Sequence, residues 1–268
     1  MRTIAIMNNK GGVGKTVTAI NLADILVRVH NKRVLLVDCD GQCNLTHFLI
    51  PEITEIEAAT TADMLTGSSE PLWEHNVWPV FPGLGLVPAA DWLYELDISK
   101  FGESDEPEWE IRPRALLDFR KAVEEDGEID FLIYDCPPGF TTSSCAALLA
   151  ADEVIIPAVL DGFSFDGIRQ MQAQIRTLRR ANKDVKIAGV LINQWHRAEH
   201  IAESEKLLRS MKVPVFHTVI RRTDKVYEST FAREPLTIYS PNSAAGRDFR
   251  CWVEELIGEE GTGDGSEV

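Results

Sequence analysis

The chain has 268 residues, a hydrophobic content of 44% and a formal net charge of −15, which is typical of a globular protein with a sizeable buried core. The negative charge argues against a protein coated in basic surface, and no apolar run approaches the roughly 20 residues of a membrane span. The N-terminus lacks signal-peptide features, and five cysteines without zinc-type spacing favour reduced thiols. We therefore expect a cytoplasmic protein.

Short apolar runs alternate with amphipathic stretches along most of the chain. Strands are predicted over residues 2–7, 33–38, 130–135, 153–159 and 186–193. Helices are predicted from Lys15 onward and over residues 113–123, 143–150, 165–181, 198–211 and 242–257. This alternation is typical of βαβ units, in which helices cover both faces of a parallel sheet. The predicted fold class is therefore α/β, with a doubly wound, mostly parallel sheet.

Residues 51–110 depart from this pattern and are predicted to form an irregular excursion. Four of the six tryptophans lie there. The segment is either a surface excursion with a small local core or, because clustered aromatic residues favour interfaces, a partner-binding surface. Residues 1–257 are predicted to form a single domain, and the acidic, glycine-rich residues 258–268 a disordered tail.

A glycine-rich loop, NNKGGVGKT at residues 8–16, separates the first predicted strand from the first predicted helix. This order is the P-loop arrangement, in which backbone N–H groups and a helix N-terminus cradle phosphates. In such a loop Lys15 neutralises the β- and γ-phosphates of ATP, and the Thr16 hydroxyl ligates Mg²⁺. The loop residues expected to contact the nucleotide are Gly11, Gly12, Val13, Gly14, Lys15, Thr16 and Val17.

Two acidic motifs follow predicted strands. Asp38 and Asp40 lie at the end of RVLLVD and just beyond it, and Asp135 ends DFLIYD. In an open α/β sheet, ligands bind at the carboxyl ends of the strands. The second motif reads as the Walker B position, where Asp135 would hold Mg²⁺ directly or through water.

These motifs together resemble the ParA/MinD family of ATPases, whose P-loop signature K-G-G-x-G-K-[ST] carries an extra lysine at the position of Lys10. Asn9 stands where the general P-loop pattern has its first glycine. The resemblance covers about residues 2–257. It implies that ATP drives homodimerisation and that Lys10 reaches the nucleotide of the other subunit. It also implies that Asp40 orients the attacking water and that Asp38, with Thr16 and Asp135, supports the magnesium shell.

The chain departs from the family pattern at three places. Gly41 replaces a proline, which should loosen the loop that follows Asp40. Val17 replaces a threonine that contacts the α-phosphate, a loss of about 1 kcal/mol. The resemblance also implies adenine contacts from Asn193 and from a loop in which Arg221 replaces a proline and is followed by Arg222. An ordinary basic surface loop remains the alternative there.

Residues 169–225 hold 13 Lys and Arg against 5 Asp and Glu. A ParA-type DNA-partitioning ATPase fits this basic stretch, because non-specific DNA affinity comes from phosphate contacts. The resemblance then implies hydrolysis stimulated by a ParB-type partner, and association with the nucleoid. Solvated helix faces are the alternative for each basic residue. The candidate DNA contacts are Arg176, Arg179, Arg180, Arg221, Arg222 and Lys225.

Two other activities use the same fold. A MinD-type positioning ATPase needs a basic amphipathic helix at its C-terminus, whereas the last 15 residues hold six acids and no base. We therefore expect no membrane partner. A metabolic or iron–sulfur ATPase would need cysteines in suitable spacing, which Cys136 and Cys145 match poorly.

Overall fold

The protein is built around a seven-stranded sheet in the order β3-β4-β2-β5-β1-β6-β7. The computed structural model describes residues 1–51, 59–68, 76–98, 111–162 and 164–258. Neighbouring strands are parallel except for the edge pair β3–β4, which is antiparallel. The predicted fold class is confirmed. The strands are β1 (Arg2–Ile6), β2 (Val34–Asp38), β3 (Trp78–Phe81), β4 (Leu84–Val87), β5 (Phe131–Asp135), β6 (Glu153–Val159) and β7 (Lys186–Asn193).

The central strands are continuous apolar runs because helices cover them on both sides. Every residue of β2 and β5 is buried. These two strands pair in register, so that Asp38 lies opposite Asp135 at their carboxyl ends. The register therefore brings together two acids that are 97 positions apart in the chain.

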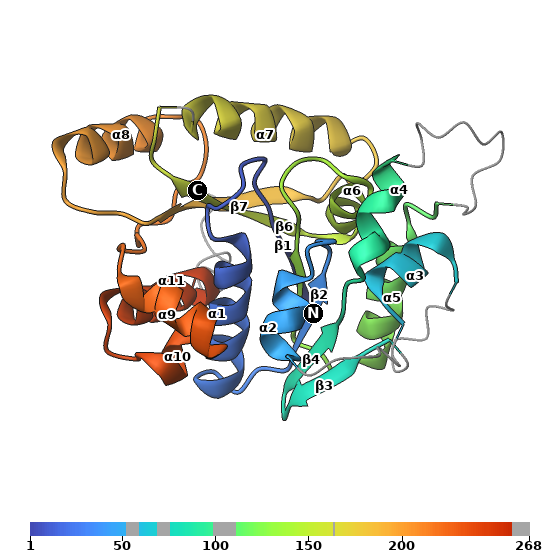
Figure 1. Ribbon diagram of the computed structural model, residues 1–268. Helices are drawn as coiled ribbons and strands as arrows, with labels where there is room; N and C mark the ends of the chain where they lie inside the picture. Colours follow the sequence, from blue (N-terminus) through green and yellow to red (C-terminus); the bar gives the residue numbers. More distant parts are fainter. Residues whose placement is uncertain (52–58, 69–75, 99–110, 163, 259–268) are drawn as a thin grey trace, which may run out of the picture.

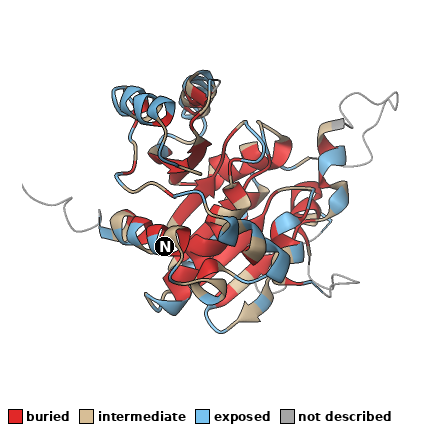
Figure 2. Cartoon of the chain, turned by 60° about the vertical axis from the view of Figure 1, so that its left-hand side comes forward, coloured by how far each residue is buried: buried red, intermediate tan, exposed pale blue. Residues whose placement is uncertain are grey.

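Helices flank the sheet on both faces (Figure 1). One core contains side chains of α1, α10 and α11, and the other contains side chains of α3 and α5–α8. Figure 2 shows the buried residues gathered on the sheet and on the helix faces turned toward it. The α-helices are α1 (Lys15–Arg28), α2 (Asn44–Leu49), α3 (Thr61–Thr66), α4 (Glu95–Ile98), α5 (Ala115–Asp126), α6 (Thr142–Ala150), α7 (Ser164–Leu178), α8 (Glu199–Arg209), α9 (Asp224–Ala232), α10 (Leu236–Tyr239) and α11 (Ala244–Gly258).

The excursion predicted over residues 51–110 contains regular structure in its described parts. It supplies α3, β3, β4, a 3-10 turn at Asp91–Tyr94 and α4, and β4 extends the parallel sheet beside β2. These elements are four to six residues long, too short for a clear hydrophobic period. Trp73, Trp109 and the acidic tail from residue 259 lie outside the described residues. The single-domain boundary stays a prediction.

Within the described part of the chain, no helix is long and apolar enough to cross a membrane.

Candidate nucleotide and magnesium site

The glycine-rich loop runs from the end of β1 into α1. Gly12 and Gly14 have φ angles of 73° and 90°, which only glycine adopts without strain. Gly14 is the residue before α1, and none of the described side chains caps that helix. The first N–H groups of α1 are therefore left for an external acceptor, as anion binding at a helix N-terminus requires.

Lys15 lies inside this loop with its side chain mostly buried. Its Nζ donates to the Lys10 carbonyl oxygen at 3.1 Å. Burial lowers the pKa of Lys15, while the carboxylates of Asp135 and Asp40 oppose that shift. A buried ammonium between a phosphate cradle and two acids is suited to neutralise an incoming anion.

Asp135 ends β5 as a fully buried carboxylate. Neither of its oxygens has a hydrogen-bond partner in the described structure. Burial raises the pKa of Asp135 well above its usual range and nearby Asp38 adds to this. The Thr16 hydroxyl approaches closely enough to lower that pKa, although it is not in hydrogen-bonding geometry with either oxygen.

An uncompensated buried carboxylate beside a threonine hydroxyl fits a hard divalent cation that prefers oxygen ligands. Thr16 and Asp135 would therefore hold Mg²⁺ together with nucleotide phosphates. No group of three or more His, Cys, Asp or Glu residues suited to a metal occurs in the described residues. Phosphate oxygens and waters would complete the coordination shell, as is usual for Mg²⁺ at nucleotide sites.

Asp38 is also buried, but its carboxylate is anchored. Its Oδ2 accepts hydrogen bonds from the Thr46 amide at 2.9 Å and from the Thr46 hydroxyl at 2.7 Å. Burial raises the pKa of Asp38 to about 6, although the bonds from Thr46 oppose the shift. Thr46 lies on α2, outside the acidic motif that contains Asp38 and Asp40. The sequence analysis therefore did not predict this hydrogen-bond partner of Asp38.

Asp40 lies in the loop after β2 and is only partly buried. Its amide donates to Asp38 Oδ1 at 3.1 Å, and its own Oδ1 accepts from the Gln42 amide at 3.0 Å. Gly41 lies against the turn at Asp91–Tyr94, where an added Cβ would stand 3.1 Å from the Tyr94 nitrogen. Glycine therefore allows close packing at this point. The predicted loosening of the loop stays a prediction.

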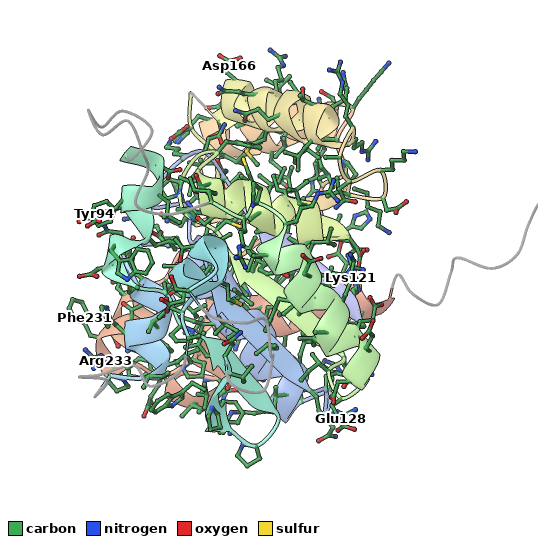
Figure 3. All side chains as sticks on the ribbon, turned by 90° about the vertical axis from the view of Figure 1, so that its right-hand side faces the viewer. Tyr94, Lys121, Glu128, Asp166, Phe231 and Arg233 are labelled. Carbon is green, nitrogen blue, oxygen red and sulfur yellow. The ribbon has the colours of Figure 1, made fainter. Side chains whose placement is uncertain are left out.

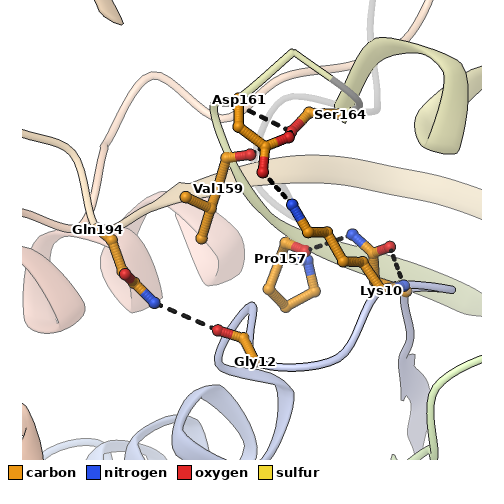
Figure 4. Close-up of polar contacts among 8 residues, drawn as sticks. Lys10, Gly12, Pro157, Val159, Asp161, Ser164 and Gln194 are labelled. Carbon is orange, nitrogen blue, oxygen red and sulfur yellow. Dashed lines mark hydrogen bonds and ion pairs between the residues drawn. The ribbon is translucent and has the colours of Figure 1, made fainter.

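Lys10 points away from its own phosphate cradle. Its ammonium forms an ion pair with Asp161, in the loop between β6 and α7 (Figure 4). Its amide donates to Asn8 Oδ1 at 3.0 Å, and Asn8 in turn donates to the Pro157 carbonyl at 2.8 Å. Asn8 and Asp161 were not predicted as site residues, because neither belongs to the P-loop signature.

The end of β7 meets the P-loop from the other side. Asn193 Nδ2 donates to the Val13 carbonyl at 2.9 Å, and Gln194 Nε2 donates to the Gly12 carbonyl at 3.3 Å. The predicted adenine residue Asn193 thus contacts the phosphate loop itself. Gln194 was not predicted as a site residue. Its position directly after a strand is the only feature of the sequence that could have indicated a role at the site.

A hollow of about 240 Å³ adjoins this contact and extends to α9. A larger hollow of about 850 Å³ lies at the amino ends of the strands and is lined by Arg2 and Glu153, which pair with each other. Ligands of open α/β sheets bind at the carboxyl ends, so the smaller hollow is the candidate site for the nucleotide base. Its lining comprises Gly12, Gly14, Val17, Asn193, Gln194, Arg221, Arg222, Thr223, Val226, Tyr227 and Thr230.

The predicted basic residues differ in their partners. Arg221 pairs with Asp248 at 2.6 Å, and this contact raises the pKa of Arg221. Lys225 pairs with Glu228 at 2.6 Å, and Arg179 Nε donates to the Val185 carbonyl at 2.8 Å. In the part of the chain that is described, the exposed side chains of the remaining candidates form no ion pair or hydrogen bond. These are Arg176, Arg180 and Arg222.

Known proteins match both the sequence and the fold. A family model described as an AAA domain matches residues 1–187. The chromosome partitioning protein ParA of Caulobacter vibrioides is 30% identical over 97% of this chain and 95% of its own length. The chromosome-partitioning ATPase Soj of Thermus thermophilus is 32% identical over 96% of both chains. The chain belongs to the ParA/MinD family of P-loop ATPases.

Solved structures agree with this assignment. The septum site-determining protein MinD of Pyrococcus horikoshii, complexed with Mg-ADP, superposes with a TM-score of 0.74 at 25% identity. That alignment covers 97% of each chain. A family member thus holds Mg²⁺ and a nucleotide on this fold.

Proposed function

We propose that this chain is a DNA-partitioning ATPase that binds Mg-ATP, dimerises on ATP and then binds DNA without sequence preference. A centromere-binding partner of the ParB type would stimulate hydrolysis and release. The observation that carries the proposal is the buried Lys15 at the start of α1 together with the buried acids Asp38 and Asp135 at adjoining strand ends. The chain's relatives are named chromosome-partitioning proteins.

The chemistry follows from the charges at the strand ends. Lys15 neutralises the β- and γ-phosphates, and Thr16 and Asp135 hold Mg²⁺, which offsets charge on the transferred phosphate. Asp40 orients the attacking water from its partly exposed position beside the buried acids. The Thr46 hydrogen bonds to Asp38 fix the loop that carries Asp40.

Lys10 couples nucleotide binding to dimerisation in this proposal. Within one chain its ammonium is held by Asp161. Contact with a second subunit's nucleotide requires that this ion pair opens. Since the triphosphate of ATP is more highly charged than one carboxylate, the exchange favours the dimer when ATP is bound.

The DNA surface is proposed at the exposed arginines at the C-terminal end of α7 and in the turn that follows it, and at the loop before α9. Arg176, Arg180 and Arg222 are the strongest candidates because they form no intramolecular ion pair within the described residues. The net charge of −15 opposes DNA approach, so a dimer that presents two such patches would bind much better than a single subunit.

The test is DNA binding by the Asp40→Ala protein with ATP and with ADP, on unrelated duplexes at two salt concentrations. ATP-dependent binding that ignores sequence and weakens steeply with salt is expected. The charge-reversed Arg176→Glu/Arg180→Glu protein should lose this ATP-dependent DNA binding. Lys121→Glu on α5 (Figure 3) provides a control at a basic residue outside the proposed surface. An ATP dimer that binds no DNA would exclude DNA as its track and leave a MinD-type cycle or a metabolic ATPase to be tested.

A further inference from the structure

The two amides at the end of β7 act on consecutive peptide groups of the P-loop. Asn193 Nδ2 holds the carbonyl of Val13 and Gln194 Nε2 holds the carbonyl of Gly12 (Figure 4 shows the second contact). Asn193 is buried, and its Oδ1 accepts from the Gln194 amide at 2.8 Å. Both polar ends of the Asn193 side chain are therefore engaged within the protein.

Peptide planarity gives these contacts a consequence for the phosphate site. In a trans peptide, the C=O and the N–H of the next residue point in opposite directions. Holding the Gly12 and Val13 carbonyls toward β7 therefore directs the Val13 and Gly14 N–H groups away from β7. Neither of these N–H groups donates a hydrogen bond within the described part of the chain.

The local backbone is tightly constrained around this contact. Gln194 has a φ of 54°, a left-handed conformation that is unfavourable for a non-glycine residue. A Cβ on Gly14 would lie 2.3 Å from Asn193 Nδ2, so the two segments pack without a gap. Strain kept beside a loop with free N–H donors is typical of a functional site.

We propose that Asn193 and Gln194 are positioning residues for the phosphates: they hold two P-loop carbonyls so that the Val13 and Gly14 N–H groups face the nucleotide. This rests on the proposed nucleotide binding. It assigns Asn193 to the phosphate loop, in addition to any contact with the base. It gives Gln194 a role through its side chain.

The decisive variant is Gln194→Gly, because glycine accepts the left-handed backbone and removes only the side chain. Its affinity for Mg-ADP should fall about fivefold, the equivalent of one neutral hydrogen bond. Mg-tripolyphosphate, which has no base, should lose affinity by the same factor when it competes with a fluorescent ADP analogue. Asn193→Ala should weaken both probes by about tenfold or more, because its bond is shorter and buried.

Asn31→Gly is the matched control. Asn31 also has a left-handed backbone, with a φ of 52°, but lies in the loop between α1 and β2. This variant should keep wild-type affinity for both probes. The melting temperature of the nucleotide-free Gln194→Gly protein should fall no further than that of Asn31→Gly.

The outcomes separate the inference from the proposed function. Unchanged affinity of Gln194→Gly for both probes would overturn the positioning role while leaving nucleotide binding intact. Weaker ADP binding with unchanged tripolyphosphate binding would assign these residues to the base instead. A wild-type protein that binds neither probe would overturn the proposed function itself.

Discussion

The nucleotide site and the proposed DNA surface use charge in opposite ways. At the strand ends, Lys15 and Asp135 are buried, and Asp135 lacks a hydrogen-bond partner among the described residues. On the DNA surface the basic side chains are exposed, and Arg221 and Lys225 already have acidic partners within the chain. Buried charges interact strongly because little water screens them, whereas exposed charges act weakly and additively. One substitution should therefore disable the first region, and several are needed for the second.

The largest effect is expected from Lys15→Ala. Loss of the buried ammonium removes charge-assisted contacts to two phosphates, and affinity for Mg-ATP should fall by about a hundredfold or more. Isothermal titration calorimetry measures this directly, with Lys121→Ala on the surface of α5 as the control. Retained affinity in Lys15→Ala would contradict the P-loop assignment.

Asp135→Asn should affect stability and metal dependence in opposite directions. Because burial raises the pKa of Asp135 in the folded state, its ionised form destabilises the nucleotide-free protein at neutral pH. The neutral amide removes the buried charge and should stabilise that state by about 1–2 kcal/mol, since one pKa unit corresponds to about 1.4 kcal/mol. Urea unfolding measures this change.

The same variant should lose the tighter ADP binding that Mg²⁺ confers on the wild type. The stabilisation of the nucleotide-free protein by Asp135→Asn should disappear as the pH falls, because Asp135 of the wild type is then protonated. An Asp135→Asn protein that is less stable when free of nucleotide, or that keeps its Mg²⁺ dependence, would contradict the metal-site assignment.

Asp161→Asn tests the link between Lys10 and dimerisation. The Lys10–Asp161 pair is partly exposed, so it contributes only about 0–1 kcal/mol. Its loss should leave the affinity of the single chain for ADP unchanged. The protein concentration at half-dimerisation with ATP should fall by up to about fivefold, as measured by light scattering on an Asp40→Ala background. A weaker ATP dimer would mean that Asp161 serves the interface itself.

The smallest effects should come from single basic residues on the DNA surface. Arg176→Ala/Arg180→Ala should lower the slope of log affinity against log salt by about 2 for each subunit that contacts DNA, roughly one for each phosphate contact. Arg221→Ala/Lys225→Ala should change the slope less, because Asp248 and Glu228 already hold these side chains. Equal changes in the two double variants would show that the intramolecular ion pairs open when DNA binds.

Much of the fold and site could be predicted from local pattern alone. Continuous apolar runs identify the buried parallel strands, and the glycine loop before α1 identifies the phosphate cradle. The acids Asp38 and Asp135 were found because each ends such a run. By contrast β3 and β4, at four residues each, are too short for periodicity to reveal them.

By itself the sequence determined the parts of this protein in which function depends on residue type at fixed local spacing: the P-loop, the strand-end acids and the α/β alternation. The tertiary structure decided which distant groups meet: Asp161 with Lys10, Thr46 with Asp38, and the Asn193–Gln194 pair with the P-loop carbonyls. It also decided which arginines are held by acids. These contacts join residues that are remote in the chain, and strand order and register bring them together only in the folded sheet.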